Sequence, residues 1–218
     1  MNKFIISILT ILLLTNCNHS QHKSVDKNDR LELVPEPDKD ERLKYEALDT
    51  LRKSGCILTD PDTSVCGIKI GNSNTAIQII GDKDEADSLD QYNYYSTYKR
   101  ETLTLTQHPG DGKYCISIFK ITKSGKKTKG YRVLNIDAFK TEKGIKIGMS
   151  KKEITNRLGF CYAPIDSVNG YIELYYRLEA PKDSKTKLLA SNNMPIYYAS
   201  YKLSNNRLYE FEFGFEYP

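Results

Sequence analysis

The sequence predicts an α+β fold. Two tandem units, each a short helix followed by antiparallel strands, are expected to form one curved sheet with the helices on one face. The pentapeptide GIKIG occurs at 67–71 and again at 144–148. Each copy precedes an apolar-periodic stretch that ends at a glycine, and then runs in which apolar and polar residues alternate. Alternation of this kind indicates half-buried strands, and its recurrence is typical of a duplicated structural unit.

The second copy carries a complete set of helix signals. Ser150 and Glu153 have the spacing of a capping box, in which the side chain of each residue bonds the backbone of the other. Ile154 and Leu158 fall on one helical face, and Gly159 is a typical end of a helix. A helix is therefore expected between Ser150 and Gly159.

The first copy carries weaker signals of the same kind. Ser73 is the expected cap, no glutamate follows at capping-box distance, and Gly81 is the expected end. A longer amphipathic helix is expected over 38–55, because leucines and alanine recur every four residues and basic residues precede Gly55. We expect this helix to pack on the first unit.

Alternating stretches after each copy predict the strands. The expected strands are 103–106, 114–122 and 131–139 in the first unit, and 171–179, 196–203 and 207–217 in the second. The stretch 84–99 has no decisive period and is expected to be a helix or an ordered loop. In 207–217 the aromatic residues alternate with glutamates and are expected to pack beneath the helices.

The segment GIKIGMSKKEITNRLG (144–159) resembles the signature of the BamE/SmpA-type lipoproteins and of the β-lactamase-inhibitor-protein-like superfamily. The matching residues are Gly148, Met149, Ser150, Glu153, Leu158 and Gly159. The resemblance implies two tandem units, here 40–143 with the N-terminal helix and 144–218. It also implies a free sheet face on which another protein docks.

The N-terminus is typical of an exported bacterial lipoprotein. Residues 1–16 carry Lys3 and then the apolar run Phe4–Leu14, which is too short to span a bilayer but suits a signal peptide. Cys17 is the expected lipidated residue, and Asn18 favours the outer membrane. A plain secreted protein and an uncleaved anchor are the alternatives. Residues 17–39 are polar and charged, and they are expected to form a flexible tether.

Four cysteines remain if Cys17 carries lipid, and in an oxidising compartment an even number indicates disulfides. Cys56, Cys66, Cys115 and Cys161 allow three connectivities. We favour Cys56 with Cys66, because the turn-forming Asp-Pro-Asp lies between them, which leaves Cys115 with Cys161. A zinc site is the alternative, but these cysteines lack C-x-x-C spacing.

Composition argues against several functional classes. The formal net charge is +4, which is too small to indicate nucleic-acid binding. No nucleophile or phosphate-loop motif is present, and His108 lies among turn-forming residues. The acidic residues at 60–62 and 82–85 lack regular ligand spacing, so a solvated loop is favoured over a cation site. No catalytic residue, cofactor or metal is therefore expected.

A protein-binding face is the functional prediction. In 171–179 and 196–203 the aliphatic positions indicate the core face, so the positions between them point the other way. Tyrosine and arginine are common interface anchors on such a surface. The expected partner-binding residues are Tyr171, Glu173, Tyr175, Arg177, Tyr198 and Lys202.

These observations predict a non-enzymatic, lipid-anchored envelope protein that binds another protein as an inhibitor, an immunity factor or an assembly accessory. The alternative is a structural outer-membrane lipoprotein that positions envelope components. An enzyme is the third option.

Overall fold

The computed structural model describes residues 39–87, 89–124, 130–166, 171–179 and 187–216. Within them the chain has four α-helices and ten β-strands, eight of which form one mostly antiparallel sheet. The α+β class is therefore confirmed. The expected signal peptide (1–16), the expected lipidation site Cys17 and residues 17–38 of the expected tether lie outside the described residues.

The helices of the described chain are α1 (Lys39–Ser54), α2 (Ser73–Ile80), α3 (Lys151–Leu158) and α4 (Lys187–Asn192). The strands are β1 (Ser64–Val65), β2 (Ile68–Lys69), β3 (Gln91–Tyr95), β4 (Glu101–Gln107), β5 (Ile116–Lys123), β6 (Arg132–Val133), β7 (Ala163–Asp166), β8 (Tyr171–Glu179), β9 (Ile196–Ser204) and β10 (Arg207–Glu216).

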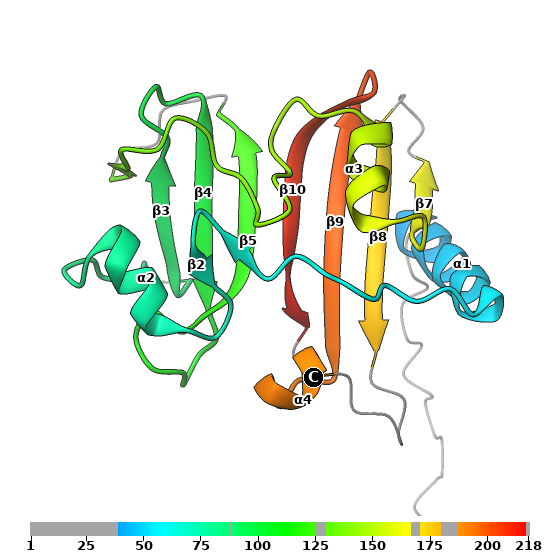
Figure 1. Ribbon diagram of the computed structural model, residues 1–218, viewed down its shortest axis with the longest axis horizontal. Helices are drawn as coiled ribbons and strands as arrows, with labels where there is room; N and C mark the ends of the chain where they lie inside the picture. Colours follow the sequence, from blue (N-terminus) through cyan, green and yellow to red (C-terminus); the bar gives the residue numbers. More distant parts are fainter. Residues whose placement is uncertain (1–38, 88, 125–129, 167–170, 180–186, 217–218) are drawn as a thin grey trace, which may run out of the picture. The chain divides into compact units, whose positions relative to one another are not determined.

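The large sheet consists of two meanders that meet at their last strands. Its order is β6-β3-β4-β5-β10-β9-β8-β7, and Figure 1 shows the strands from β3 to β7 from left to right. β5 and β10 are antiparallel and pair from Ile118 with Gly214 to Thr122 with Glu210. Only β6 pairs parallel within this sheet. The β5–β10 pairing therefore joins 91–123 to 163–216 in one surface.

One apolar core covers what we call the inner face, the side of the sheet that carries α2, α3 and α4. It contains residues from both meanders and from all three of these helices. Phe211, Phe213 and Phe215 are buried in it, as their alternation predicted. Tyr209 does not follow them, because the pairing register shifts between Leu208 and Glu210.

The two GIKIG copies make the same backbone contact. The amide of Gly71 donates to the carbonyl of Ile116 on β5, and the amide of Gly148 donates to the carbonyl of Leu208 on β10, each at 2.8 Å. Both glycines have positive φ, 67° and 91°, a region that glycine enters without a steric cost. Each copy is thus fixed to the last strand of the meander that follows it.

The helices after the two copies also match closely. Both α2 and α3 span eight residues and end at a glycine with φ of 84° or 82°. The expected capping box of α3 is confirmed, since Ser150 and Glu153 bond each other's backbone. The expected cap of α2 is wrong by one residue, because the side chain of Asn72 rather than Ser73 accepts from the amide of Thr75.

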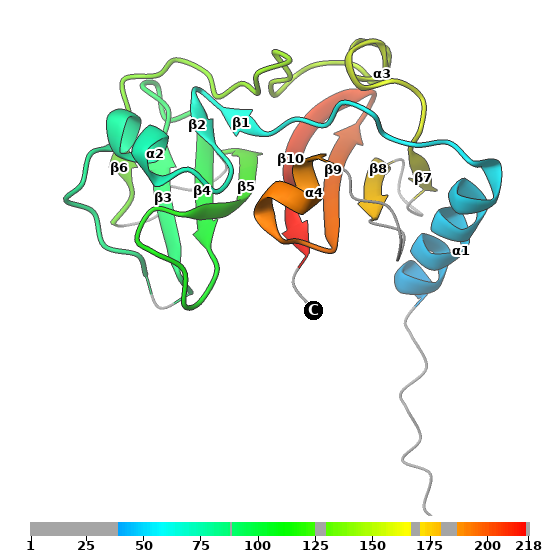
Figure 2. The ribbon, with the colours of Figure 1, turned by 60° about the horizontal axis from the view of Figure 1, so that its bottom comes forward.

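The N-terminal helix forms where the sequence predicts it but lies on the opposite side of the sheet. α1 packs against β7, and Leu48 lies in a separate apolar cluster with Ala163 and Tyr175. Figure 2 shows α1 across the sheet from α3. The expectation that all helices cover one face is therefore wrong, as is the expected packing of this helix on the first unit. Periodicity predicts an apolar stripe on the helix, but it does not predict the surface against which that stripe packs.

The chain after α1 wraps around the β7 edge of the sheet. Residues 56–63, which we call the strap, cross the inner face from α1 to β1 (Figure 1) and bury Leu58 and Asp62. A disulfide joins Cys56 to Cys161, just before β7, over a sequence separation of 105 residues. It fastens the strap where the chain changes face.

This disulfide corrects the expected cysteine pairing. Cys56 does not pair with Cys66, nor Cys115 with Cys161; Cys66 and Cys115 are both free thiols. Ser64–Val65 and Ile68–Lys69 pair around the Cys66-Gly67 turn, and the thiol of Cys66 faces the carbonyl of Lys140. The turn-forming residues between Cys56 and Cys66 favoured a local disulfide, but residues 56–63 instead cross the inner face from α1 to β1.

Two further predictions need correction. The stretch 84–99, which was expected to be a helix or an ordered loop, contains the strand β3, and 131–139, which was expected to be a strand, contains only the two strand residues of β6. β8 matches its predicted range 171–179, and the turn of Asn205 and Asn206 joins β9 to β10 with both φ angles positive, as a two-residue hairpin requires.

We expect Gly214→Ala to destabilise the fold by about 3 kcal/mol, because overpacking a close contact between strands forces the backbone apart. A Cβ at this position would lie 2.3 Å from the carbonyl oxygen of Ser117 and 2.7 Å from the Cα of Ile118. Gly112→Ala is the matched control, since nothing lies within 4 Å of its Cβ position. Urea unfolding of both variants is the measurement, and equal midpoints would contradict the prediction.

We expect replacing Cys56 and Cys161 by serine to cost about 4 kcal/mol of stability, since closing a loop of this length restricts the unfolded chain. Replacing Cys66 and Cys115 together serves as the control and should leave the response to reductant unchanged. Denaturant unfolding with and without reductant measures both. A disulfide-linked peptide containing Cys66 in a non-reducing digest would contradict the pairing.

Candidate functional site

The six expected partner-binding residues do share one face of the sheet, which we call the outer face. Tyr171, Glu173, Tyr175 and Arg177 alternate on β8 with Leu174, Tyr176 and Leu178, which lie in the main core. Across the pairing with β9, Glu173 lies opposite Lys202, and Arg177 lies opposite Tyr198. The predicted alternation of both strands is therefore confirmed.

The expected exposure of Tyr175 is wrong. Its side chain is only 3% exposed, because α1 covers this end of the outer face. The ammonium of Lys44 lies 4.1 Å from the centre of its ring, and its ring stacks on Tyr198 with centroids 6.3 Å apart. Burial also raises the pKa of the Tyr175 hydroxyl. A strand pattern shows which face a residue is on, but it cannot show that a distant helix covers that face.

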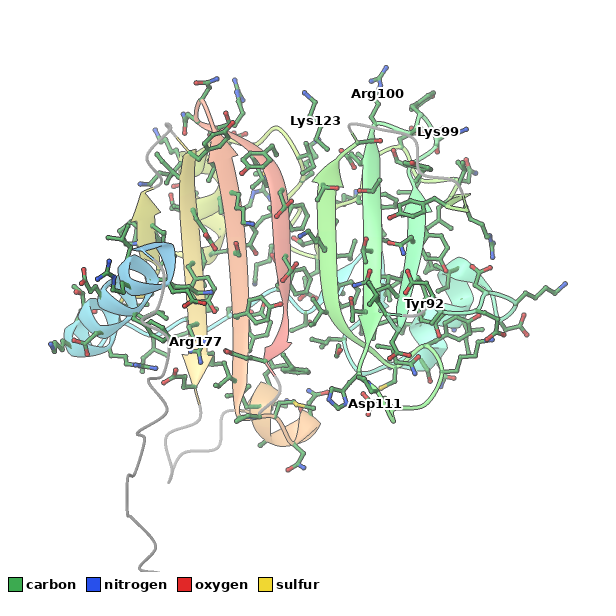
Figure 3. All side chains as sticks on the ribbon, turned by 180° about the vertical axis from the view of Figure 1, so that it is seen from behind. Tyr92, Lys99, Arg100, Asp111, Lys123 and Arg177 are labelled. Carbon is green, nitrogen blue, oxygen red and sulfur yellow. A yellow bond between two sulfur atoms is a disulfide. The ribbon has the colours of Figure 1, made fainter. Side chains whose placement is uncertain are left out.

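Arg177 lies beside α1 in a network of charges (Figure 3). Its guanidinium donates to the carboxylates of Glu179 and Glu216, each at 2.5 Å, and to the hydroxyl of Tyr175 at 3.3 Å. Arg52 of α1 also pairs with Glu179 at 2.5 Å. The charged end of this face is thus shared between the sheet and the helix.

The part of the outer face beyond α1 carries a second network, centred on the seam between β5 and β10. Lys202 pairs with Glu210 at 2.8 Å, and Lys120 lies 3.4 Å from Glu210 and 3.6 Å from Glu212. Tyr198 donates to Glu212 at 2.6 Å. Lys120 belongs to one meander, and Glu210 and Glu212 belong to the other, so the two pairs of Lys120 form only when the seam is closed.

Sequence reasoning missed Lys120, Glu210 and Glu212 as members of this surface. The glutamates were visible as the partners of the aromatic residues in 207–217, and Lys120 as the polar position between Phe119 and Ile121. The sequence pattern does not indicate that β5 and β10 are neighbours, and only their pairing brings these side chains together.

Threonines extend the outer face over β4 and β5. The hydroxyls of Thr102 and Thr122 lie 2.5 Å apart, and Thr104 donates to the side chain of Asn93 at 2.7 Å. Side chains of this kind hold a flat hydrogen-bonding surface without a large apolar patch. Figure 3 shows this side of the sheet bare of helices except at the α1 end in the part of the chain that is described.

The charges of the seam are held in their ionised forms. Burial by itself raises the pKa of Glu210, but the bonds from Lys202 and Lys120 outweigh it and keep the pKa below its usual value. Burial likewise lowers the pKa of Lys202, and the bond to Glu210 outweighs it, so this pKa is raised. The face therefore presents fixed charges of both signs at neutral pH.

Elsewhere, two cavities are lined by residues that the structure describes. A groove of about 820 Å³ lies between the strap and α4, with Leu58, Leu178 and Leu188 in its lining and charges at Lys143 and Lys187. A smaller one of about 250 Å³ lies beside β3 and β6, where Asp84 pairs with Arg132. In the first cavity the hydroxyl of Thr63 donates to Glu142, and in the second the hydroxyl of Tyr94 donates to Asp84, each at 2.8 Å.

Asp62 has the most perturbed carboxyl of the inner face. It is fully buried and accepts from the hydroxyl of Tyr201 at 3.2 Å and the amide of Lys143 at 3.3 Å. Its carbonyl accepts from the hydroxyl of Tyr197 at 2.7 Å. Burial raises its pKa to about 6. Because no solvent reaches it, we assign Asp62 to holding the strap on β9.

Searches for similar proteins give no match, whether against models of protein families, curated proteins or solved structures. Among the described residues, no cluster of three or more His, Cys, Asp and Glu side chains is placed to bind a metal ion. None of the described helices has the length and apolar character to span a membrane.

We expect Asp62 to make the fold less stable as pH rises through about 6. Its pKa in the folded chain lies above the ordinary value of 3.8, so between these values the folded chain binds more protons than the unfolded chain, and the charged form opposes folding. The contribution lost between about pH 4 and about pH 7 is roughly 3 kcal/mol.

Asp62→Asn removes this titration while keeping an acceptor for the amide of Lys143. The measurement is the free energy of unfolding of both chains across this pH range, and the excess of the native chain over the variant should fall as pH rises. A pH-independent difference would show that the carboxyl titrates normally.

Proposed function

We propose that the chain is a non-enzymatic, lipid-anchored protein of the bacterial envelope that binds another protein through the outer face of its sheet. The observation that carries this proposal is the polar wall over β9, β10, β5 and β4. Its charges and hydroxyls are fixed by cross-strand bonds, and outside α1 no described helix covers it. Preorganised polar side chains lose little freedom on association, which favours specific docking.

The tandem repeat belongs to the same proposal, with units at 40–143 and 144–218. Three observations support it: each GIKIG copy bonds the last strand of its own meander, α2 and α3 have equal length and matching glycine ends, and the two meanders meet antiparallel. A single meander with one helix would leave an exposed strand edge on β5 or β10. Duplication closes both edges and doubles the width of the wall.

The anchoring part of the proposal is supported by the sequence alone. The apolar run of 1–16, Cys17 and the polar stretch that follows suit a lipoprotein of the outer membrane with a tether. A flexible coil of 22 residues has a root-mean-square span of roughly 25 Å. This span would let the outer face reach a partner near the membrane surface.

One observation favours the alternative, a structural outer-membrane lipoprotein that positions envelope components. The charges of the outer face that we describe already have partners within the chain, such as Lys202 with Glu210 and Arg177 with Glu216. A partner must therefore compete with these pairs or bind around them, which favours a weak contact. In that case the anchor matters more than the face.

We expect Lys120→Ala combined with Lys202→Ala to reduce capture of the partner about tenfold, since each removes a fixed charge from the centre of the wall. The measurement is cross-linking of the tagged, lipidated chain in the native envelope, followed by mass spectrometry of the captured protein. Lys69→Ala combined with Lys152→Ala is the matched control, because both lysines are exposed and lie outside the large sheet, on β2 and α3. Equal capture by the two double variants would sink the proposal.

The same capture with Cys17→Ser separates the two candidates. A binding protein released from the membrane keeps its partner in solution, whereas a positioning protein loses both capture and function. Circular dichroism of every variant confirms that the fold is intact.

A further inference from the structure

We propose that the outer face over β7, β8 and β9 is a docking site for an amphipathic helix, and that α1 is a displaceable cover which occupies it within the chain. The inference deepens the proposed function and rests on it for the identity of the site, because α1 covers Tyr175 and lies beside Arg177 at the end of the proposed binding wall.

α1 is held by little apolar burial. Of residues 41–54, Leu48 is the only one that is buried. Its cluster contains Ala163 and Tyr175, and four partly buried residues pack against it: Ala47, Leu51, Ile165 and Tyr198. By contrast, the half-length helix α3 buries Ile154, Thr155 and Leu158, and two of them, Ile154 and Leu158, lie in the main core. Burial of apolar surface is the main force that holds a helix on a sheet. A helix with one buried side chain therefore opens far more readily than the core.

The polar contacts of α1 are exposed to solvent. Arg52 makes two bonds to Glu179, at 2.5 Å and 3.2 Å, but its side chain stays 55% exposed, and solvent screening limits what such a pair contributes to stability. Lys53 pairs with Asp49 within α1 itself, so that pair survives undocking. The ammonium of Lys44 also contacts the sheet, where it lies 4.1 Å from the centre of the Tyr175 ring.

The connection at the end of α1 allows it to swing without unfolding the rest. Gly55 follows the helix with φ of +68°, and nothing lies within 4 Å of its Cβ position. Cys56 comes next and is bonded to Cys161. Motion of α1 therefore stops at the disulfide, and the strap beyond it stays on the inner face.

Undocking exposes a surface whose chemistry defines its occupant. It consists of the stacked rings of Tyr175 and Tyr198, the small side chain of Ala163, and the carboxylate of Glu179. The fitting partner is an amphipathic helix with a leucine to bury, a lysine one turn before it and an arginine one turn after it. α1 has this arrangement at Lys44, Leu48 and Arg52, and a partner helix would take its place.

The first test measures hydrogen exchange of the full mature chain. We expect the amides of α1 to exchange at least about tenfold faster than those of α3, by local opening. Leu48→Ala should accelerate α1 further while leaving β8 and β9 unchanged. Tyr45→Ala is the matched control, since this side chain is 64% exposed on the same helix. Exchange of α1 only together with the core would overturn the inference.

The second test uses a labelled synthetic peptide of residues 39–54 as the probe. We expect it to bind the Leu48→Ala chain about tenfold more tightly than the unaltered chain or the Tyr45→Ala chain, because only the first leaves the site open. A peptide with alanine in place of its own leucine should not bind. Equal binding to all three chains, or none to the opened one, contradicts the inference.

These outcomes are independent of the capture experiment with Lys120 and Lys202. If capture ignores those lysines while the peptide binds the opened chain, the proposed function fails and the docking site stands. If capture depends on those lysines while α1 never opens, the proposed function stands and the docking site for a helix fails.

Discussion

The antiparallel pairing of β5 with β10 is the constraint on which the rest of the structure depends. It joins two meanders that are far apart in sequence, from Ile118 with Gly214 to Thr122 with Glu210. At Gly214 the strands approach so closely that a Cβ would meet the backbone of Ser117 and Ile118. The seam thereby merges two small aromatic layers into one core, where Phe119 stacks on Phe213 at 5.1 Å. Without this pairing, each meander would leave the edge of its last strand exposed.

The sheet that the seam completes has two faces with different chemistry, an apolar inner face and a polar outer face. On the inner face, three helices and the strap fill the space over large aromatic side chains, and even the buried carboxyl of Asp62 is bonded by its neighbours. On the outer face, the same strands carry charges and hydroxyls that bond between strands. Lys120 pairs with Glu210 across the seam, and Thr102 bonds Thr122 between β4 and β5. The same alternation along each strand supplies apolar side chains to the inner face and polar side chains to the outer face, because successive side chains of a strand point to opposite sides.

The β7 edge shows how a sheet of this kind ends. β7 is only four residues long and carries Pro164, and a short strand with proline resists pairing with another chain. The chain also wraps around this edge, with α1 outside, the strap inside and the Cys56–Cys161 disulfide at the crossing. The outer face is thus closed at one end by a thin cover and open over its centre.

The sequence by itself determined the local structure of this protein. It determined the capping box of α3, the range of β8, the hairpin of β9 and β10, and which face Tyr175 and Tyr176 each occupy. Such features depend on residues within a few positions of one another, so their spacing encodes them.

Only the tertiary structure decided which elements meet. The pairing of β5 with β10, the partner of Cys56, the side of the sheet that α1 covers and the burial of Tyr175 all join residues distant in the chain. An apolar stripe does not specify the surface on which it packs, and a cysteine does not specify its disulfide partner, because many sites of similar chemistry could take that place. Selection among them comes from the fit of the whole core.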